Sequence, residues 1–491
     1  MKPLLTRRTI LAGLASSASA MAFADAPEVS VRPQPRMPRP TKLIAPSDAL
    51  VARAKLSGAI GFAVADARTG ELLEARLGDQ RMPPASTLKV VTALYALDKL
   101  EPTYRFATRA FATGPVVNGK LEGDLVLVGG GDPTLDTDRL ADLAMAVREA
   151  GISEVTGKFL VWANALPTGE RIDDQQPEHV SYNPSYSGIN LNFNRVHFEW
   201  KRQQDDQYGI TMQARALRFR PSTSVSQMAI VDVKSPVFDY RRGQDRDRWF
   251  VARRALGNEG ARWLPVRFPA LYAGDVFRTL ARSNGIVLPP PELADMLAQG
   301  RDLAQVEGPI LVEVLRSMLK YSTNLTAEIS GLSASRTYGP GLASLEQSAG
   351  RMAGWARTHF GTMGVRFRDH SGLGYGSEMS AGDMVAILAA NRQIRPFLKT
   401  VNLTLNKGRP APKGVEVHAK TGTLNYVSSL AGFVTPTNGR PLCFAIFGAD
   451  TARRDAIPPE ARERPPGARS WARRSRQLQK ELIRGWVERF T

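Results

Sequence analysis

The chain has 491 residues, which is too many for one small domain and enough for two or three domains with hydrophobic cores. Hydrophobic residues make up 43% and charged residues 23%, so the composition excludes a largely disordered chain. The formal net charge of +18, with a pI of about 10.2, indicates either an anionic partner or generic solubility.

Residues 1–24 have the pattern of an export signal peptide. Arg7 and Arg8 precede an apolar run from Ile10 to Ala24, which ends in the cleavage-site pattern Ala22-Phe23-Ala24. The paired arginines fit a twin-arginine signal and a general secretory signal equally well. We therefore expect a periplasmic protein that is soluble or peripherally associated. Export argues against nucleic acid as a partner and leaves an anionic wall polymer or membrane surface.

The next segments predict a tether, a hairpin and a helix. Residues 25–47 contain six prolines and are expected to form a flexible tether. Two strand-like runs, at 60–65 and 71–74, flank Arg68-Thr69-Gly70 and predict a β-hairpin. A helix is expected to begin after Pro83-Pro84-Ala85, because apolar residues then recur at spacings of three and four: Val90, Ala93, Leu94, Leu97 and Leu100.

A change in the sequence pattern, from helical to short β-like runs, divides the chain. Short β-like runs separated by Gly, Asn and Pro extend from 103 to 269, and amphipathic helical patterns return at 270–285 and 311–332. We therefore predict one α/β domain made of residues 48–102 and 270–491. A β-rich insertion at 103–269, with two subdomains, interrupts it.

The C-terminal part predicts strands followed by a helix. Two apolar runs around Asn438-Gly439 form a strong hairpin signal. Cys443 lies in the second run and is expected to be a buried, unreactive thiol. A closing helix should place Trp471, Leu478, Leu482 and Trp486 on one face. The five histidines and one cysteine show no metal-ligand spacing, so we expect neither a metal nor a cofactor.

Three short motifs carry the candidate chemistry: Ser86-Thr87-Leu88-Lys89, Ser322-Thr323-Asn324 and Lys420-Thr421-Gly422-Thr423. Ser86 and Lys89 are one helical turn apart, and a lysine in an apolar, cation-rich pocket can lose enough basicity to activate a serine.

The other two motifs would complete this site. Ser322 can relay a proton and Asn324 can hold the substrate backbone. Lys420 supplies positive charge for a substrate carboxylate, with the hydroxyls of Thr421 and Thr423 beside it. Gly422 lets a substrate lie close to the strand. The amides of Ser86 and Thr423 would form an oxyanion hole.

Each motif alone is a weak signal, because serines often cap helices and strand lysines are usually solvated. The chain also contains a second S-x-x-K pattern, Ser317-Met318-Leu319-Lys320, and a second S-x-N pattern, Ser181-Tyr182-Asn183. Ser317 lies inside a predicted helix and Ser181 lies in the insertion, whereas Ser86 begins a helix. The order and context of the three motifs therefore favour Ser86.

With these motifs, the chain resembles the class C low-molecular-mass penicillin-binding proteins, the D-alanyl-D-alanine carboxypeptidase/endopeptidase family (peptidase family S13). The resemblance covers nearly all of the chain after the tether. It includes Pro84-Ala85-Ser86, Gly129-Gly130-Gly131-Asp132-Pro133-Thr134-Leu135, Tyr182-Asn183, Ser187-Gly188-Ile189-Asn190-Leu191-Asn192 and Asp369-His370-Ser371-Gly372-Leu373. The chain departs from the family at Gly374-Tyr375-Gly376-Ser377, and we expect His370 to be a surface residue of this loop.

The resemblance implies a transpeptidase domain with an antiparallel sheet flanked by helices, into which β-rich domains are inserted. It implies a secreted serine D-Ala-D-Ala carboxypeptidase, or DD-endopeptidase, that acts on peptidoglycan peptides and is acylated by β-lactams. It also implies that Asp132 faces the cleft and binds a free amine of the substrate, in a pocket lined by Leu424. A tight turn is the alternative role of Asp132.

Two other functions stay open from the sequence. A β-lactamase shares the three motifs but is normally one compact domain, and an inactive wall-binding protein could keep the fold. The intact set of Ser86, Lys89, Ser322, Asn324 and Lys420 argues against the second. No residue is identified as the base for deacylation.

Overall fold

The computed structural model describes residues 46–205, 207–405 and 410–491. The predicted export signal at 1–24 and all but the end of the tether at 25–47 lie outside the described residues. The first element is the helix α2 (Ser47–Ala54). Within the described ranges, no helix combines the length and the apolarity needed to cross a membrane.

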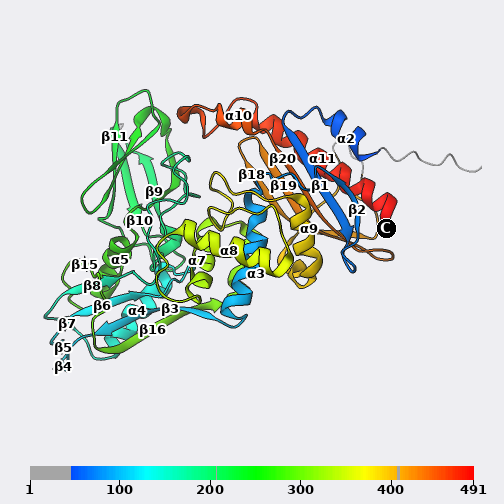
Figure 1. The fold of residues 1–491 in the computed structure, drawn as a ribbon. Helices are drawn as coiled ribbons and strands as arrows, with labels where there is room; N and C mark the ends of the chain where they lie inside the picture. The colour runs from blue at the N-terminus through cyan, green and yellow to red at the C-terminus, as the bar shows by residue number, and fades with distance from the viewer. Residues whose placement is uncertain (1–45, 206, 406–409) are drawn as a thin grey trace, which may run out of the picture. The chain divides into compact units, whose positions relative to one another are not determined.

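The largest sheet has six antiparallel strands in the order β17-β18-β19-β20-β1-β2 (Figure 1). The predicted hairpin at 60–74 is confirmed, since β1 pairs with β2, and so is the hairpin around Asn438-Gly439, since β19 pairs with β20. The strands are β1 (Ala59–Asp66), β2 (Leu72–Arg76), β17 (Lys399–Thr400), β18 (Val415–Leu424), β19 (Val427–Pro436) and β20 (Leu442–Ala449).

Both faces of this sheet are covered, because successive side chains of a strand point to opposite faces. Ala63 and Ala65 of β1 belong to a core formed with the helices on one face. Phe62 and Val64 belong to a second core formed with α2 and the C-terminal helix. The helices of the first face are α3 (Leu88–Leu100), α6 (Leu311–Tyr321), α7 (Asn324–Arg336), α8 (Leu345–Phe360) and α9 (Ala381–Ala390), and the C-terminal helix is α11 (Ala468–Phe490).

The inserted part contains several smaller sheets. A five-stranded sheet has the order β15-β8-β6-β3-β16, and a small sheet has the order β4-β5-β7. The helices α4 (Thr137–Glu149) and α5 (Pro269–Ser283) pack with the five-stranded sheet. The strands are β3 (Arg105–Ala112), β4 (Val116–Val117), β5 (Lys120–Leu121), β6 (Leu125–Gly129), β7 (Glu154–Val155), β8 (Phe159–Trp162), β15 (Pro291–Leu293) and β16 (Arg301–Ile310).

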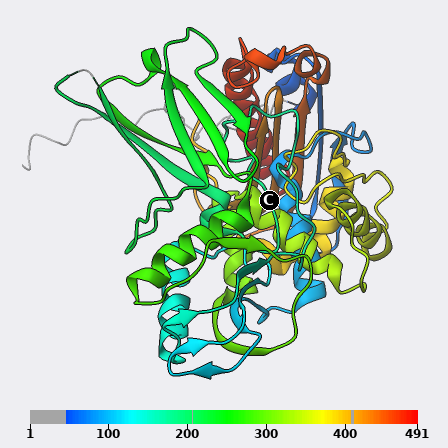
Figure 2. The same cartoon turned by 90° about the vertical axis from the view of Figure 1, so that its left-hand side faces the viewer.

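Two three-stranded sheets, β10-β9-β14 and β11-β13-β12, lie apart from these strands (Figure 2). One continuous hydrophobic cluster nevertheless joins both groups of strands. The strands are β9 (Arg195–Arg202), β10 (Tyr208–Gln213), β11 (Ser226–Val231), β12 (Phe238–Arg242), β13 (Asp247–Ala252) and β14 (Glu259–Pro265).

The insertion ends later in the chain than the boundary of 269 predicted from the sequence. β16 pairs with β3 along most of its length, and Tyr272, Val276 and Leu288 are buried in the core of the insertion. Residues 270–310 therefore pack with the insertion rather than with the six-stranded sheet. The chain returns to the helices beside that sheet at α6, which follows β16 directly.

Candidate active site

Ser86 lies in a short 3-10 turn, Ala85–Thr87, that leads into α3. Ala85 has φ +46°, a left-handed conformation that is uncommon for a residue with a Cβ. The turn is fixed by Thr87 Oγ1, which donates a hydrogen bond of 2.6 Å to the carbonyl of Pro84. Ser429 Oγ of β19 donates to the same carbonyl over 2.5 Å. These bonds anchor the serine to the central sheet.

Lys89 is completely buried one turn after Ser86. Its Nζ lies 3.0 Å from Ser86 Oγ, 2.7 Å from Asn324 Oδ1 and 2.8 Å from the carbonyl oxygen of Ser371. Burial lowers the pKa of Lys89, and the charges of Glu328 and Asp369 oppose this effect. The structure therefore places a lysine of reduced basicity in contact with the serine hydroxyl.

The S-x-N motif lies at the junction of α6 and α7. Ser322 ends α6 in a left-handed conformation with φ +60°, and Asn324 is the first residue of α7. Asn324 Nδ2 donates a 2.8 Å bond to the carbonyl of Tyr182, so the insertion contacts the catalytic motif directly. This bond also orients Asn324 Oδ1 toward Lys89.

The third motif lies on β18, and its Lys420 contacts the second motif. Its Nζ donates 2.8 Å to Ser322 Oγ and 2.7 Å to the carbonyl of Thr421. The side chain is 3% exposed. Burial first, and then the charges of Lys89 and Lys399, hold the pKa of Lys420 well below its usual value. Thr421 and Thr423 alternate with it along the strand and are exposed.

Gly422 permits a close approach between β18 and the serine. A Cβ at this position would lie 2.1 Å from Ser429 Oγ and 2.8 Å from the backbone nitrogen of Ser86. The backbone of Thr423 follows immediately, so the two amides expected to form an oxyanion hole belong to adjoining segments. A glycine is required here by space rather than by conformation.

These residues open onto a cleft of about 900 Å³. Ser86, Ser322 and Asn324 line one part of it, together with Thr423 and Leu424. The cleft is also lined by Gln175, Gln176 and Tyr182 of the insertion, by Leu373, and by a segment that runs from Arg454 to Arg476.

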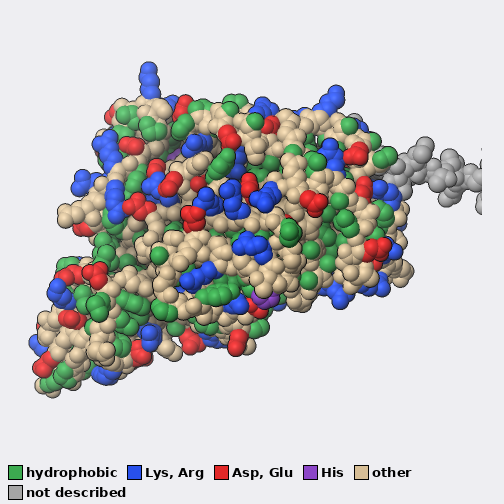
Figure 3. All heavy atoms as spheres, viewed as in Figure 1, with side chains coloured by type: hydrophobic (Ala, Val, Ile, Leu, Met, Phe, Trp, Pro, Cys, Tyr) green, Lys and Arg blue, Asp and Glu red, His purple; other side chains and the backbone are tan. Residues whose placement is uncertain are grey.

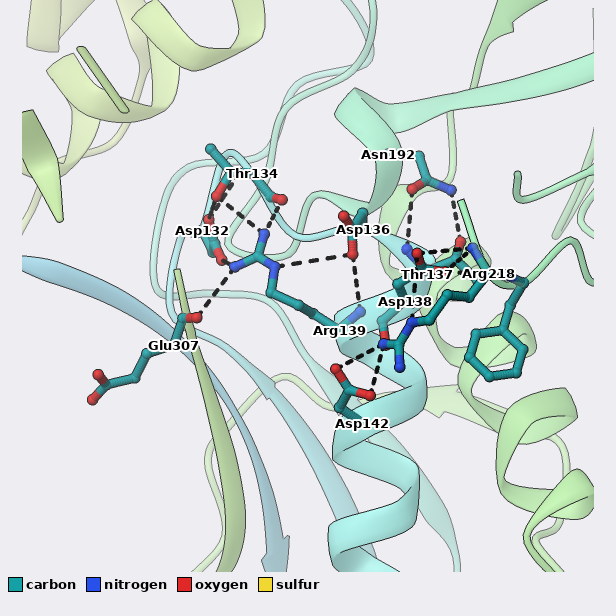
Figure 4. A network of polar contacts seen from close by, with 11 residues as sticks. Asp132, Thr134, Asp136, Thr137, Asp138, Arg139, Asp142, Asn192, Arg218 and Glu307 are labelled. Carbon is teal, nitrogen blue, oxygen red and sulfur yellow. Dashed lines mark hydrogen bonds and ion pairs between the residues drawn. The ribbon is translucent and has the colours of Figure 1, made fainter. Parts of the chain in front are cut away.

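Asp132 does not lie in this cleft, which corrects the expectation that it faces the substrate. Its side chain is 2% exposed and accepts hydrogen bonds of 2.8 Å from the backbone nitrogen and Oγ1 of Thr134. Arg139 Nη1 of α4 lies 2.7 Å from Asp132 Oδ2 and also contacts the carbonyl of Glu307 in β16 (Figure 4). The turn that was the alternative role of Asp132 is therefore present, and the ion pair with Arg139 links this turn to α4.

Glu328, a fully buried carboxylate in α7, was not identified from the sequence. Its Oε2 accepts a 2.8 Å bond from the amide of His370, and Oε1 accepts a 3.0 Å bond from the amide of Ser371. Burial, reinforced by the charge of Asp369, raises the pKa of Glu328. Because Ser371 in turn accepts from Lys89, the carboxylate supports the catalytic lysine. A signal was available, since Glu328 lies one helical turn after Asn324.

The expected surface position of His370 is wrong. The residue is fully buried, its Nε2 lies 2.8 Å from Ser348 Oγ, and burial lowers its pKa to about 3. The loop from Asp369 to Leu373 therefore packs inside the molecule. Its carbonyl at Ser371 touches Lys89, so this loop is part of the site.

A serine beside a buried lysine, on a helix that packs against an antiparallel sheet carrying K-T-G, defines a serine-type peptidase of the penicillin-recognising class. The chain belongs to the D-Ala-D-Ala carboxypeptidase 3 (S13) family, whose sequence model matches residues 45–463. This membership confirms the predicted family and the predicted enzyme class, a serine-type D-Ala-D-Ala carboxypeptidase.

Individual relatives agree with the family assignment. The D-alanyl-D-alanine carboxypeptidase of Actinomadura sp. (strain R39) is 28% identical over 465 residues, which cover 85% of this chain and 84% of the relative. The D-alanyl-D-alanine carboxypeptidase DacB of Haemophilus influenzae is 24% identical over 421 residues, covering 79% and 85%. The crystal structure of penicillin binding protein 4 (dacB) from Haemophilus influenzae superposes with a TM-score of 0.71 at 20% identity. It covers 89% of this chain and 99% of that one, which confirms the predicted fold class.

Proposed function

We propose that this protein is an exported peptidase that cleaves D-alanyl-D-alanine ends, or D-centred crosslinks, of peptidoglycan peptides through an acyl-enzyme on Ser86. The observation that carries the proposal is the 3.0 Å contact between Nζ of the fully buried Lys89 and Oγ of Ser86, which lines the cleft. A serine hydroxyl is a weak nucleophile, and an adjacent base is what activates it.

The partners of Lys89 support its role as that base. Asn324 Oδ1 and the carbonyl of Ser371 can only accept hydrogen bonds, so a neutral amine directs its two hydrogens to them. Its lone pair then points to Ser86 Oγ, which is the one partner that can donate. Burial favours this neutral state, because it penalises the ammonium.

The reaction follows from this arrangement. Ser86 Oγ attacks the carbonyl carbon of the penultimate residue while its proton passes to Lys89 Nζ. The tetrahedral intermediate carries a negative oxygen, which the amides of Ser86 and Thr423 stabilise. The carbon–nitrogen bond then breaks, and the leaving amine receives a proton through Ser322 Oγ. Water hydrolyses the resulting ester and restores the serine hydroxyl.

Lys420 has the position of a carboxylate anchor. Its Nζ lies 2.8 Å from Ser322 Oγ, and a carboxylate bound there would favour the ammonium form of this lysine. The terminal carboxylate of a peptide fits this cationic corner, and so does the carboxylate of a β-lactam. A structure of penicillin binding protein 4 from Haemophilus influenzae contains a bound β-lactam, which supports covalent inhibition of this chain by the same class of compound.

Replacement of Ser86 by alanine tests this function. Ser86→Ala should abolish covalent uptake of penicillin and cleavage of a peptide ending in D-Ala-D-Ala, with an unchanged circular dichroism spectrum. Ser317→Ala is the matched control, because Ser317 belongs to the second S-x-x-K pattern but is exposed on α6. Peptide mapping by mass spectrometry locates the adduct. An adduct that persists in Ser86→Ala refutes the proposal, and rapid turnover of a chromogenic cephalosporin would indicate a β-lactamase.

A further inference from the structure

The part of the cleft away from Ser86 is lined by arginines. They come from the connection between β20 and α11 and from the first turns of α11, and they are Arg454, Arg462, Arg464, Arg469 and Arg476. We call these five residues the basic wall. Lys and Arg side chains also gather near the centre of the face shown in Figure 3.

Within the described part of the chain, none of the five members of the basic wall forms an ion pair, although the charges of Asp173 and Asp455 act on Arg454. Arg454 is half-buried, and its guanidinium lies 5.4 Å from the ring centroid of Tyr375. Arg462 Nη1 donates a 2.9 Å bond to the carbonyl of Gln175. Arg464, Arg469 and Arg476 are exposed.

The two acidic residues that line the cleft have other partners. Glu463 lies 3.3 Å from Arg262 Nη2 of β14, outside the basic wall. Asp455 accepts a 3.2 Å hydrogen bond from the hydroxyl of Tyr375. In addition, α11 begins at the cleft, and its N-cap Gly467 offers no side chain to cap the first amides. Helix N-termini attract anions, so this end adds to the positive field of the arginines.

The order of residues along β18 shows which part of a substrate reaches the basic wall. Lys420 would hold the terminal carboxylate, and Thr423 lies at the carbonyl under attack. Leu424 and Asn425 follow in the direction of the chain, and Asn425 Nδ2 donates a 2.7 Å bond to the carbonyl of Arg462. A peptide laid along this strand therefore places the residues before the cleaved bond next to the arginines.

We propose that the basic wall binds free carboxylates on the substrate residues that precede the cleaved bond, so that the enzyme prefers acidic donor peptides. The inference rests on the proposed function and adds a substrate class to it. Guanidinium groups match carboxylates in shape and charge. A cleft with several unpaired arginines is therefore better suited to a peptide with two or more carboxylates than to a neutral one.

A pair of peptides tests the preference. Both end in D-Ala-D-Ala, and they differ only in whether two upstream carboxylates are free or amidated. Wild type should cleave the free acid with a kcat/KM about tenfold higher at low ionic strength, and added salt should reduce this preference. Arg469→Gln/Arg476→Gln should lose most of the preference. Penicillin acylation of each variant is measured alongside, because it reports the chemistry at Ser86 without an upstream peptide.

Arg473→Gln/Arg220→Gln is the matched control. Both residues are exposed arginines outside the cleft, and Arg473 lies on α11 between the two wall positions. This variant should keep the wild-type preference. Equal kcat/KM values for the two peptides in wild type would overturn the inference, and so would an equal loss in the control. Poly(glycerol phosphate) tests the other possible ligand. If it inhibits wild type but not Arg469→Gln/Arg476→Gln, and both peptides are cleaved equally, the basic wall binds a phosphate polymer and the inference is wrong.

Binding to Ser86→Ala separates failure of this inference from failure of the proposed function. The Kd of each peptide for this variant, measured by calorimetry, reports contacts without chemistry. Equal Kd values for acid and amide would refute the role of the wall. Absence of penicillin uptake and of cleavage by wild type would refute the proposed function, whereas a tighter Kd for the acid would still support the wall.

Discussion

Lys89 and Lys420 lie in one buried region, and the charge of Lys89 contributes to the lowered pKa of Lys420. An anion that binds beside Lys420 would stabilise its ammonium form. A carboxylate about 4 Å from an ammonium interacts by roughly 4 kcal/mol at an effective dielectric constant near 20. Since each ~1.4 kcal/mol corresponds to a factor of ten in rate, such a contact has a large effect on acylation.

Lys420→Ala should therefore slow acylation by penicillin by about a hundredfold or more. Lys420→Arg should restore activity only in part, because the planar guanidinium differs in reach from a compact ammonium. Stopped-flow acylation kinetics measure both effects. Lys399→Ala is the comparison variant: it removes an exposed charge that lowers the pKa of Lys420 but keeps the Lys420 amine, so acylation should not slow. If Lys420→Ala lowers the rate of penicillin acylation by less than about threefold, Lys420 is not the carboxylate anchor.

Glu328→Gln should change the pH profile as well as the rate. The Glu328 charge raises the pKa of Lys89, so its removal lowers that pKa, and the rising limb of kcat/KM should move to lower pH. Glutamine also cannot accept from both amides, which leaves the Ser371 carbonyl less firmly held. We expect a loss of stability of about 1–3 kcal/mol. If the rising limb of kcat/KM stays at the same pH and only the stability falls, the role of Glu328 is purely structural.

At the scale of elements, the site depends on how closely β18 approaches the turn that carries Ser86. Gly422 makes this approach possible, and loss of one oxyanion donor typically costs about 10²–10³ in rate. Gly422→Ala should therefore reduce acylation by about that factor while the protein stays folded. Activity close to wild type would show that the strand can move without loss of function.

A double variant identifies which contact matters. Gly422→Ala/Ser429→Ala removes the clash with Ser429 Oγ but keeps the approach of the new Cβ to the Ser86 nitrogen. Because Ser429→Ala alone also loses the bond to the Pro84 carbonyl, that single variant is the reference, and the double variant should stay well below it if the oxyanion hole is the reason. Recovery would instead attribute the effect to the packing of β18 against β19. Penicillin acylation and thermal denaturation of both variants provide the measurement.

Local elements were predictable from the sequence because local patterns determine them. The hairpin at β1 and β2, the Asn438-Gly439 hairpin and the buried face of α11 all follow from periodicity and turn residues. The contact of Ser86 with Lys89 followed from their spacing on a helix. The buried state of Cys443 followed from its apolar strand.

Features that depend on distant contacts were not predictable. The end of the insertion is set by β16, which pairs with β3 about 190 residues earlier, and no local pattern reports such a pairing. His370 was expected to be a surface residue of its loop, yet the loop is buried and the carboxylate of Glu328, on another helix, accepts a hydrogen bond from the His370 amide. Asp132 was placed in the cleft by resemblance, whereas Arg139 binds it inside the insertion. The partners of β16 and of the His370 loop are far away in sequence, whereas Arg139 lies close to Asp132 in sequence and was not identified.

On the scale of the molecule, α11 connects the cleft to the opposite face of the central sheet. Its first turn borders the cleft, and its last turns pack with α2 against the strands. Trp486 is fully buried there, with its ring centroid 5.5 Å from that of Phe62 and 6.0 Å from that of Phe444. Its Nε1 donates a 2.8 Å bond to Glu74 Oε2 of β2. The C-terminal helix thus contacts both the edge strand β2 and the central strands β1 and β20.

Trp486→Ala should lower the free energy of unfolding by about 3–5 kcal/mol, since it removes a large buried ring and leaves a cavity. Trp486→Phe, which keeps an aromatic ring but loses the bond to Glu74, should cost less. Chemical denaturation measures both. Penicillin acylation of the folded variants should stay close to wild type, because Ser86 and Lys89 face the other core of the sheet, which Trp486 does not join. An acylation rate that falls in step with stability would show that the two faces are coupled through the strands.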